Sequence, residues 1–376
     1  MTYLDNSATT KPEREVADKI YEMLTEKFGN PSSFHKAGLD ANDEITKARE
    51  IIAKSLCAQS EEIYFTSGGT EANNLAIFGA VEALKRRGNR IVTTAIEHES
   101  VLRSAQELEK RGFEVIYLSP DSKGRISEEQ IFEAVNDKTI LVSMMYVNNE
   151  VGSVLPVASI KKAVKRANAP ALVHIDCVQA YSKIQIKPEK LGADLISVSA
   201  HKIHGAKGVG ALYIRKGVRI LPLIFGGEQE KRIRPGTQAA PLIAGFGKAA
   251  ELIPDYDEQK RKIEELSTYA KGELKKLNGV IINSGDDASP YIINLYVPSF
   301  MTSQTVVQHL SSKYGVYVSN GSACAKGKKS HVLSAMKLSD KIIDKSIRVS
   351  FSRNTTKEDI DSLIYALSET IEEYHI

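Results

Sequence analysis

The feature that most constrains the fold of this chain is a regular alternation of short apolar runs with amphipathic helical stretches over its first two-thirds. The segment 62–67, "EIYFTS", is typical of a strand, and 71–88 has apolar residues at helical spacing before a stop at Gly88. Further strands are predicted for "RIVTTA", "FEVIYLS", "TILVSMMYV", "ALVHIDC", "DLISVSA" and "GVGALYIR". Such β–α alternation predicts an α/β fold with a parallel or mostly parallel sheet and helices on both faces.

The regular alternation of strands and helices ends near residue 255. A long charged helix over 255–277 leads to strands near 279–282 and 291–297 and a helix over 303–313. The runs "GVYVS" and "SIRVSF" and a final helix follow, which predicts a smaller α+β domain. No repeat or low-complexity linker separates the two parts, so we expect them to pack closely.

Composition excludes several classes of protein. In 376 residues the net charge is +3, and positive and negative residues are mixed along the chain. The sequence therefore lacks the clustered positive charge of a nucleic-acid binder. No apolar run reaches the length of a membrane span, and the N-terminus lacks the pattern of a secretory signal. Three widely spaced cysteines predict neither a disulfide framework nor a metal site. We therefore expect a cytoplasmic protein.

A glycine-rich turn, "FTSGGTEANN", follows the first of the predicted strands. Gly68 and Gly69 follow the strand and Thr70 and Glu71 open a helix, so backbone N–H groups are exposed at a positive helix end, which suits a phosphate on Gly69 and Thr70. The alternative is an ordinary strand-to-helix turn capped by Thr70. The motif is not a Walker loop, because no Gly-Lys-Ser/Thr follows.

Two later strands also end in polar residues. Asp176 ends "VHID", and Gln179 follows three residues later. A carboxylate at the end of an apolar strand is costly without a cationic partner. The alternative is that Asp176 caps a helix. Ser199, His201 and Lys202 follow "LISV", where a buried lysine can become a nucleophile, the alternative being a surface loop lysine. A phosphate cradle, an acid for a pyridinium nitrogen and a lysine are the three parts that pyridoxal phosphate needs.

With these motifs, the chain resembles the class V aminotransferase branch of fold-type I pyridoxal-phosphate enzymes, and within it the cysteine desulfurases. The resemblance runs end to end through "YLDNSATT", "FGNPSSFHKAG", "FTSGGTEANNLAI", "EHESV", "VNNEVG", "HIDCVQ", "SAHKIHGAKGVGALY", "RPGTQ", "SNGSAC" and "SIRVSFSRNTT". The Ser-Ala-Cys loop is similar to that of the group I enzymes. The resemblance implies a seven-stranded, mostly parallel sheet in a large domain, 14–255, and a small domain formed by 1–13 and 256–376, with the cysteine loop at about 320–331.

The resemblance also implies a role for each matching residue at the cofactor. Lys202 would hold it covalently and later move the Cα proton, His98 would stack on its ring and assist proton transfer, and Asp176 would keep its nitrogen protonated. Gln179 would hydrogen-bond the phenolic oxygen. The implied phosphate ligands are Gly69, Thr70, Ser199, His201 and, from the second subunit of a homodimer, Thr237.

The substrate contacts implied are Asn149, which also touches the cofactor, and Arg348, which would grip the carboxylate of L-cysteine through a bidentate fork. Each assignment has a simpler alternative: His98 as a satisfied loop histidine, Asn149 as a turn cap and Arg348 as a surface charge.

Cys324 lies in "SNGSACAKGKK", without large apolar neighbours, which favours an exposed reactive thiol over a packed one. The resemblance implies that its thiolate takes the sulfur of L-cysteine as a persulfide, leaving alanine, and that Lys326, Lys328, Lys329 and His98 are candidates for lowering its pKa. Cys57, in "IIAKSLCA", and Cys177 are expected to pack in the interior.

The implied acceptor of the sulfur is a protein, either an iron–sulfur scaffold, with transient cluster contact through Cys324, or an enzyme of tRNA or cofactor thiolation. No membrane and no direct nucleic-acid partner is expected. The alternatives are a selenocysteine lyase or an aminotransferase of the same family that does not use Cys324, and, from another class, a nucleotide-binding or scaffold protein that uses "SGGT" for a different phosphate.

Overall fold

The computed structural model describes residues 1–321 and 329–374, and within them the larger sheet has seven strands in the order β2-β8-β7-β6-β5-β3-β4. The bounds are β2 Ile63–Thr66, β3 Arg90–Thr94, β4 Glu114–Leu118, β5 Thr139–Met145, β6 Leu172–Asp176, β7 Leu195–Ser199 and β8 Gly210–Ile214. Strand β8 is antiparallel to β2 and β7, whereas the other neighbours are parallel. The predicted mostly parallel seven-stranded sheet is confirmed.

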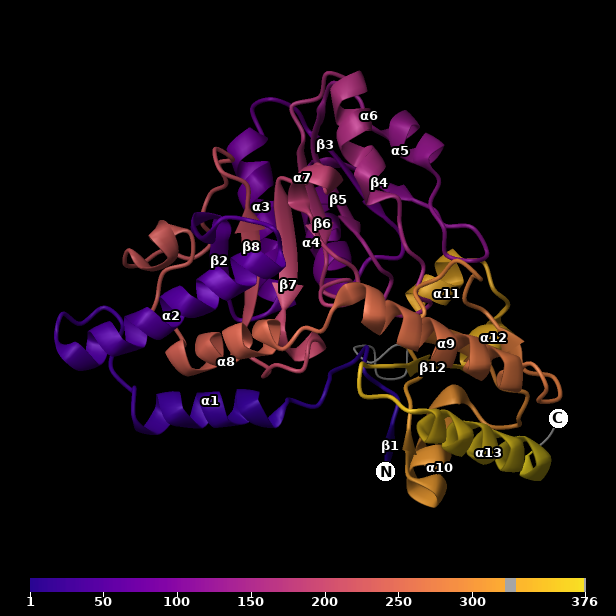
Figure 1. Ribbon diagram of the computed structural model, residues 1–376. Coiled ribbons are helices and arrows are strands. Elements are labelled where there is room, and N and C mark those ends of the chain that lie inside the picture. Colours follow the sequence, from indigo (N-terminus) through magenta and orange to yellow (C-terminus); the bar gives the residue numbers. More distant parts are fainter. Residues whose placement is uncertain (322–328, 375–376) are drawn as a thin grey trace.

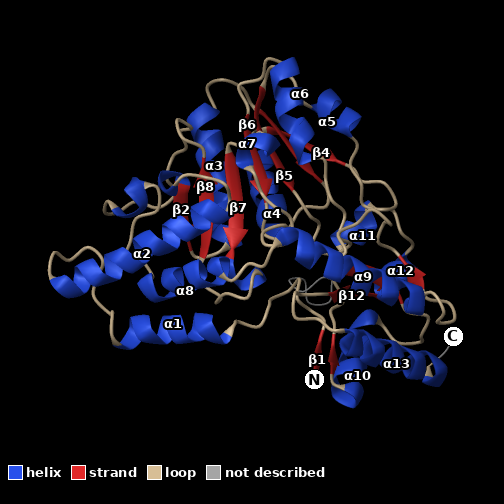
Figure 2. Cartoon of the chain, viewed as in Figure 1, coloured by secondary structure: helices blue, strands red, loops and turns tan. Residues whose placement is uncertain are grey.

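Helices cover both faces of this sheet, as Figure 2 shows. Helices α3 (Gly69–Leu84) and α4 (Glu99–Lys110) share an apolar core with Leu195 and Leu212 on one face. The next residue of each strand, Ile196 and Tyr213, belongs to the core on the other face, because successive side chains of a strand point to opposite sides. A sheet buried on both faces needs continuous apolar runs, which is why the strands were recognisable in the sequence.

Three helices pack together beside the sheet, on the left of Figure 1. They are α1 (Arg14–Thr25), α2 (Lys36–Ser55) and α8 (Ala240–Glu251). The close contact of α2 with α8 depends on Gly247, where an added Cβ would come within 2.6 Å of the Cβ of Ala48. The shorter helices are α5 Glu128–Ala134, α6 Ile160–Arg166 and α7 Pro188–Leu191.

The C-terminal third forms two small sheets with helices around them. One has the order β12-β10-β9, and in the other the N-terminal β1 (Thr2–Tyr3) pairs in parallel with β11 (Val316–Tyr317). The remaining bounds are β9 Ile281–Ile282, β10 Ile292–Tyr296, β12 Ser346–Ser350, α9 Tyr256–Leu274, α10 Ser303–Tyr314, α11 His331–Ala335, α12 Asp340–Asp344 and α13 Lys357–Glu373. One apolar cluster contains Val142, Ile293 and Val349, so the large and small sheets share a core. The division into domains at residues 13/14 and 255/256 stays a prediction.

Two local expectations need correction. The helix predicted over 71–88 begins at Gly69 and ends at Leu84. Cys57 does not pack inside a helix: α2 ends at Ser55, and Cys57 follows with a left-handed backbone (φ 52°) and an exposed side chain. A left-handed residue just beyond a helix terminates it by hydrogen-bonding back to the last turn, and the N–H of Cys57 bonds to the carbonyl of Lys54. Cys177 is buried, as expected. Among the described helices, none is both long and apolar enough to cross a membrane.

Candidate active site

A cavity of about 590 Å³ lies where the strands of the larger sheet end and the small sheets begin. Asp176 and Ser199 end β6 and β7, His98 and Asn149 follow β3 and β5, and the C-terminal ends of these parallel strands share one edge of the sheet. The cavity is lined by the predicted residues Gly69, Thr70, His98, Asn149, Asp176, Gln179, Ser199, His201, Lys202 and Arg348. The sequence motifs therefore converge on one place.

One end of the cavity is built from the start of α3 and the end of β7. Gly68 has φ 151°, a backbone conformation that favours glycine, and a Cβ on Gly69 would come within 2.8 Å of Val178 Cγ2. The hydroxyl of Ser199 is buried and has no hydrogen-bond partner among the described residues. A buried hydroxyl without a partner, facing the N-terminus of a sixteen-residue helix, fits a phosphate group.

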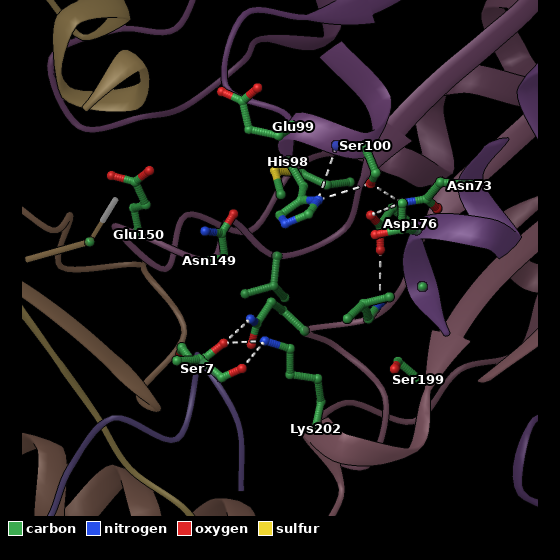
Figure 3. A pocket seen from close by; sticks show the side chains of 18 of the residues that line it. Ser7, Asn73, His98, Glu99, Ser100, Asn149, Glu150, Asp176, Ser199 and Lys202 are labelled. Atoms are coloured by element: carbon green, nitrogen blue, oxygen red, sulfur yellow. Dashed lines mark hydrogen bonds between the residues drawn. The ribbon is translucent and has the colours of Figure 1, made fainter. Parts of the chain in front are cut away.

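Lys202 ends a short 3-10 turn, Ala200–Lys202, directly after β7. Its ammonium group donates hydrogen bonds to the main-chain carbonyls of Ser7 and, at 2.8 Å, Ala8. Figure 3 shows Lys202 and His98 pointing into the cavity from opposite sides. Both of these acceptors are neutral main-chain oxygens, and they hold the amine at the cavity, where it can react with an aldehyde.

Asp176 is buried and accepts two hydrogen bonds from neutral donors. Asn73 Nδ2 donates to one carboxylate oxygen at 2.7 Å, and the N–H of Val178 donates to the other at 2.9 Å. These donors are an amide side chain and the backbone, and the cationic partner expected from the sequence, a ring nitrogen of the cofactor, stays a prediction. A carboxylate that faces a cavity in this way suits a bound cation such as a protonated pyridine nitrogen.

His98 caps the N-terminus of α4. Its Nδ1 lies 2.8 Å from the hydroxyl of Ser100 and 3.2 Å from the N–H of that residue. Burial lowers the pKa of His98, and the negative charge of Asp176 opposes this only in part. Burial also lowers the pKa of His201 to about 4, with the charge of Lys202 as the next cause. Both rings are therefore neutral at pH 7, and a neutral imidazole suits stacking and proton transfer.

Arg348 lies on β12 and is almost fully buried, with 1% of its surface exposed. Its Nη1 donates to the main-chain oxygen of Asn149 at 2.9 Å and its Nη2 to Asp5 Oδ1 at 2.7 Å. The Nε is buried and has no hydrogen-bond partner among the described residues. A guanidinium at the wall of a cavity, with donor capacity left, suits a small carboxylate.

Among the described residues, one predicted site residue does not line this cavity. Thr237 is exposed and does not line it, so any contact of Thr237 with a cofactor has to be made in another copy of the chain. Cys324 lies outside the described residues, as do Lys326 and Lys328. The structure describes the chain on both sides of this gap, and Gly321, Lys329 and His331 line the cavity.

The sequence reasoning missed several residues of the site. Ser7 and Ala8 contribute main-chain oxygens, which no side-chain pattern reveals, although "DNSA" lies in a motif quoted above. Asn73 is an amide among the buried residues of α3, which are otherwise apolar, and that anomaly could have identified it. Glu150, beside Asn149, is a buried carboxyl that accepts a hydrogen bond from Ser330 Oγ at 2.5 Å, and burial raises its pKa.

Comparisons with known proteins match nearly the whole length of the chain. A family model described as class V aminotransferase matches residues 2–363. The chain is 42% identical over 375 residues to cysteine desulfurase IscS of Dictyoglomus turgidum, covering 98% of this chain and 94% of that protein. A solved structure described as a NifS-like protein has a TM-score of 0.92 at 38% identity and 99% coverage of both chains. Another, described as SspA in complex with cysteine, has a TM-score of 0.83 at 34% identity, covering 95% of this chain and 100% of that one.

Proposed function

The chain belongs to the class V aminotransferase family and is a cysteine desulfurase, and from this premise we propose how its own residues remove sulfur from L-cysteine. The family uses pyridoxal phosphate. The observation that carries the proposal is that Lys202, Asp176 and the start of α3 all line one cavity. When bound there, pyridoxal phosphate would withdraw electrons from the substrate and so weaken the bonds at its Cα and Cβ.

The cofactor would be held by groups at both ends of the cavity. We assign its phosphate to Ser199, His201 and the N-terminus of α3 at Gly69–Thr70, because the Ser199 hydroxyl is buried and its oxygen has no hydrogen-bond partner among the described residues. Asp176 would accept the proton-bearing ring nitrogen, and His98 would cover one face of the ring. Lys202 would hold the aldehyde carbon covalently before substrate arrives.

The substrate would be held through its carboxylate by Arg348 and Asn149. Lys202 lines the same cavity as these two residues, and it would take the Cα proton of L-cysteine and later return a proton. The carbonyls of Ser7 and Ala8 hold its amine at the cavity.

The sulfur step would use Cys324. Its thiolate attacks the sulfur of the substrate, so a sulfur–sulfur bond forms while the carbon–sulfur bond breaks. The electron pair of the broken bond stays with carbon, which takes up a proton and leaves as L-alanine. The transferred sulfur, now oxidised to the sulfane level, stays on Cys324 as a persulfide.

The direct test of this proposal is incubation with L-cysteine followed by mass measurement of the intact chain and its peptides. We expect an increment of one sulfur atom on the peptide that contains Cys324, together with one alanine per transferred sulfur. The control variant Cys324→Ser should keep the yellow cofactor and lose the increment. If Cys324→Ser kept full turnover, a selenocysteine lyase or an aminotransferase that does not use Cys324 would be favoured instead.

We also propose a homodimer in which Thr237 of each chain reaches the phosphate of the other. Thr237 is exposed, and the exposed apolar residues Ile224 and Phe225 precede it, while Phe28 and Phe34 are exposed between α1 and α2. Exposed apolar side chains of this kind favour a covered surface. Sedimentation as a fully active monomer would contradict the proposal.

The persulfide would pass to a protein acceptor, an iron–sulfur scaffold or a thiolation enzyme. Such chemistry needs reduced thiols, and this supports the cytoplasm as the compartment. Transfer of labelled sulfur from the loaded chain to a purified acceptor of either kind would identify the partner.

A further inference from the structure

The segment that follows Asp176 brings Lys183 into contact with a residue of the cavity wall. Gln179 lines the cavity, and four residues on, Lys183 Nζ donates a hydrogen bond to Gln179 Oε1 at 3.1 Å. Between them, Ser182 has a left-handed backbone with φ 68°, which is uncommon for a residue other than glycine. The turn therefore has a conformation that the surrounding structure must hold in place.

The residues that hold this turn come from the C-terminal third of the chain. Gln259 on α9 donates from its amide to the carbonyl of Ser182 at 3.2 Å and to the hydroxyl of Tyr291 at 2.5 Å. The ammonium of Lys183 lies 5.6 Å from the centre of the Tyr291 ring, within the range of a cation–π contact. Lys183 and the turn before it are thus held by Tyr291 and Gln259, and neither of these residues has a role in the proposed reaction.

Gln179 has partners of opposite character on its two sides. The ammonium of Lys183 can only donate, and it faces Oε1. The main-chain carbonyl of Ser7 can only accept, and it receives a hydrogen bond from Nε2 at 2.9 Å. Rotating the amide by half a turn would set oxygen against oxygen at Ser7 and N–H against ammonium at Lys183. The NH₂ group is therefore directed to the cavity side.

We propose that Lys183 is a positioning residue, whose ammonium fixes the Gln179 amide so that an N–H, and not the amide oxygen, faces the phenolic oxygen of the bound cofactor. The inference rests on the proposed function. Burial, and next the positive charge of Arg348, lower the pKa of Lys183 to about 8, so the donor-only ammonium predominates at pH 7. His204 is a further titratable group near Lys183, and the positive charge of Lys183 is one of the causes that lower the pKa of His204.

The inference predicts a spectroscopic change. An N–H donated to the phenolic oxygen stabilises its negative charge, and so favours release of the proton that the bound chromophore shares. Without Lys183 the amide can turn and present its oxygen. The pH midpoint of the visible absorption change should then rise by about one pH unit, the size expected when one hydrogen bond to a charged group is lost.

The test is a pH titration of the visible absorption band of the cofactor-loaded protein in the wild type, Lys183→Met and Lys183→Arg. We expect a raised midpoint for Lys183→Met and a midpoint near the wild type for Lys183→Arg, which keeps a donor-only cation. Lys183→Gln, whose amide can donate or accept, should show a smaller rise in the same direction and stands in if Lys183→Met does not fold.

A double-mutant cycle links the two side chains. Gln179→Ala should raise the midpoint by itself, and adding Lys183→Met to it should produce no further rise. The matched control is Lys345→Met, which removes another half-buried lysine whose ammonium donates to a carbonyl, that of Ser299 at 2.6 Å. This variant should keep the wild-type midpoint, and thermal unfolding of the cofactor-free proteins reports any general loss of stability.

An unchanged midpoint in Lys183→Met would overturn the inference, because the carbonyl of Ser7 alone would then suffice to orient the amide. Fully additive shifts in the double variant would overturn it as well. Either result leaves the proposed function intact, since that function is tested separately by cofactor binding, by persulfide formation on Cys324 and by the turnover of Cys324→Ser.

Discussion

Two walls of the cavity each hold a cation, in different ways. We call Asp176, Gln179, Ser199 and Lys202 the cofactor wall, and Asn149 and Arg348 the carboxylate wall. In the cofactor wall the Lys202 ammonium rests on the neutral carbonyls of Ser7 and Ala8. In the carboxylate wall Arg348, with 2% of its side chain exposed, pairs with the carboxylate of Asp5. The same N-terminal segment, residues 5–8, supplies the partners of both cations.

This difference indicates which of the two cations, Lys202 or Arg348, can change its position during the reaction. Breaking a buried ion pair by removing one partner leaves an uncompensated charge and costs about 3–5 kcal/mol, whereas a hydrogen bond from a charged donor to a neutral acceptor contributes about 1.5–3 kcal/mol. Moving Lys202 away from one of these carbonyls therefore costs less than moving Arg348 away from Asp5. Arg348 stays where it is and serves as a fixed reference point for the substrate.

The largest expected effect comes from breaking the carboxylate wall. Arg348→Met removes the guanidinium from the proposed carboxylate site and leaves Asp5 without its cation. We expect kcat/KM for L-cysteine to fall about 10²–10³-fold, because hydrogen bonds to charged groups are worth about 1.5–3 kcal/mol each. Steady-state kinetics measure this, and urea unfolding should show a loss of about 2–3 kcal/mol, since Asp5 is partly exposed.

Arg348→Lys is the control for this variant. It keeps the charge and the pairing with Asp5 but loses the planar fork, so stability should recover more than activity does. If Arg348→Met retained wild-type kcat/KM, the carboxylate wall would have no part in substrate binding and the contrast between the two walls would fail.

A smaller effect is expected from the cofactor wall, at Ser199→Ala. The Ser199 hydroxyl is buried without a hydrogen-bond partner among the described residues, so removing it should leave the cofactor-free protein as stable as before or slightly more so. Affinity for pyridoxal phosphate should fall about tenfold, as expected for one hydrogen bond to a charged group. Fluorescence titration of the cofactor-free protein measures the affinity.

Thermal unfolding of the cofactor-free Ser199→Ala protein supplies the second half of this test. If Ser199→Ala lowered the stability of the cofactor-free protein markedly but left its affinity for pyridoxal phosphate unchanged, the hydroxyl would bond to another part of the protein and not to the cofactor.

The smallest effect is a pH dependence of stability. The pKa of His201 is lowered to about 4 by burial, and that of His98 is lowered too. Below pH 6.5 the unfolded chain takes up protons on these residues while the folded chain does not. Stability from them is thus fully present above pH 6.5 and is lost as the pH falls toward 4. His201→Gln should show a shallower decline in urea unfolding between pH 6.5 and 4, and equal slopes would contradict this.

Much of the site was predictable because its side chains follow strands whose apolar runs stand out. Asp176, Ser199 and Lys202 follow such strands, and all three line the cavity. Main-chain partners such as Ser7 and Ala8 were not predictable, because a carbonyl leaves no mark on the sequence. The contact of Lys183 with Gln179 depends on the left-handed turn at Ser182, which the residue types do not signal.

The remaining gaps have similar physical causes. Cys57 was placed in a helix because the residues before it are apolar, but the helix ends two residues earlier in a left-handed termination. For Thr237, an exposed position in one chain cannot be distinguished by pattern from a contact with a second chain. The placement of Cys324 lies outside the described residues, so its role is carried by sequence resemblance.

The measurement that tests the central claim most directly is borohydride reduction of the cofactor-loaded protein, followed by peptide mapping. Two lysines can be compared as attachment sites: Lys202, which lines the cavity, and Lys183, which contacts the lining residue Gln179 and whose pKa is lowered to about 8 by burial. We predict that the reduced cofactor is found on the peptide containing Lys202 and that Lys202→Ala carries none. Finding it on Lys183, or finding no covalent cofactor on the wild-type chain, would contradict the account.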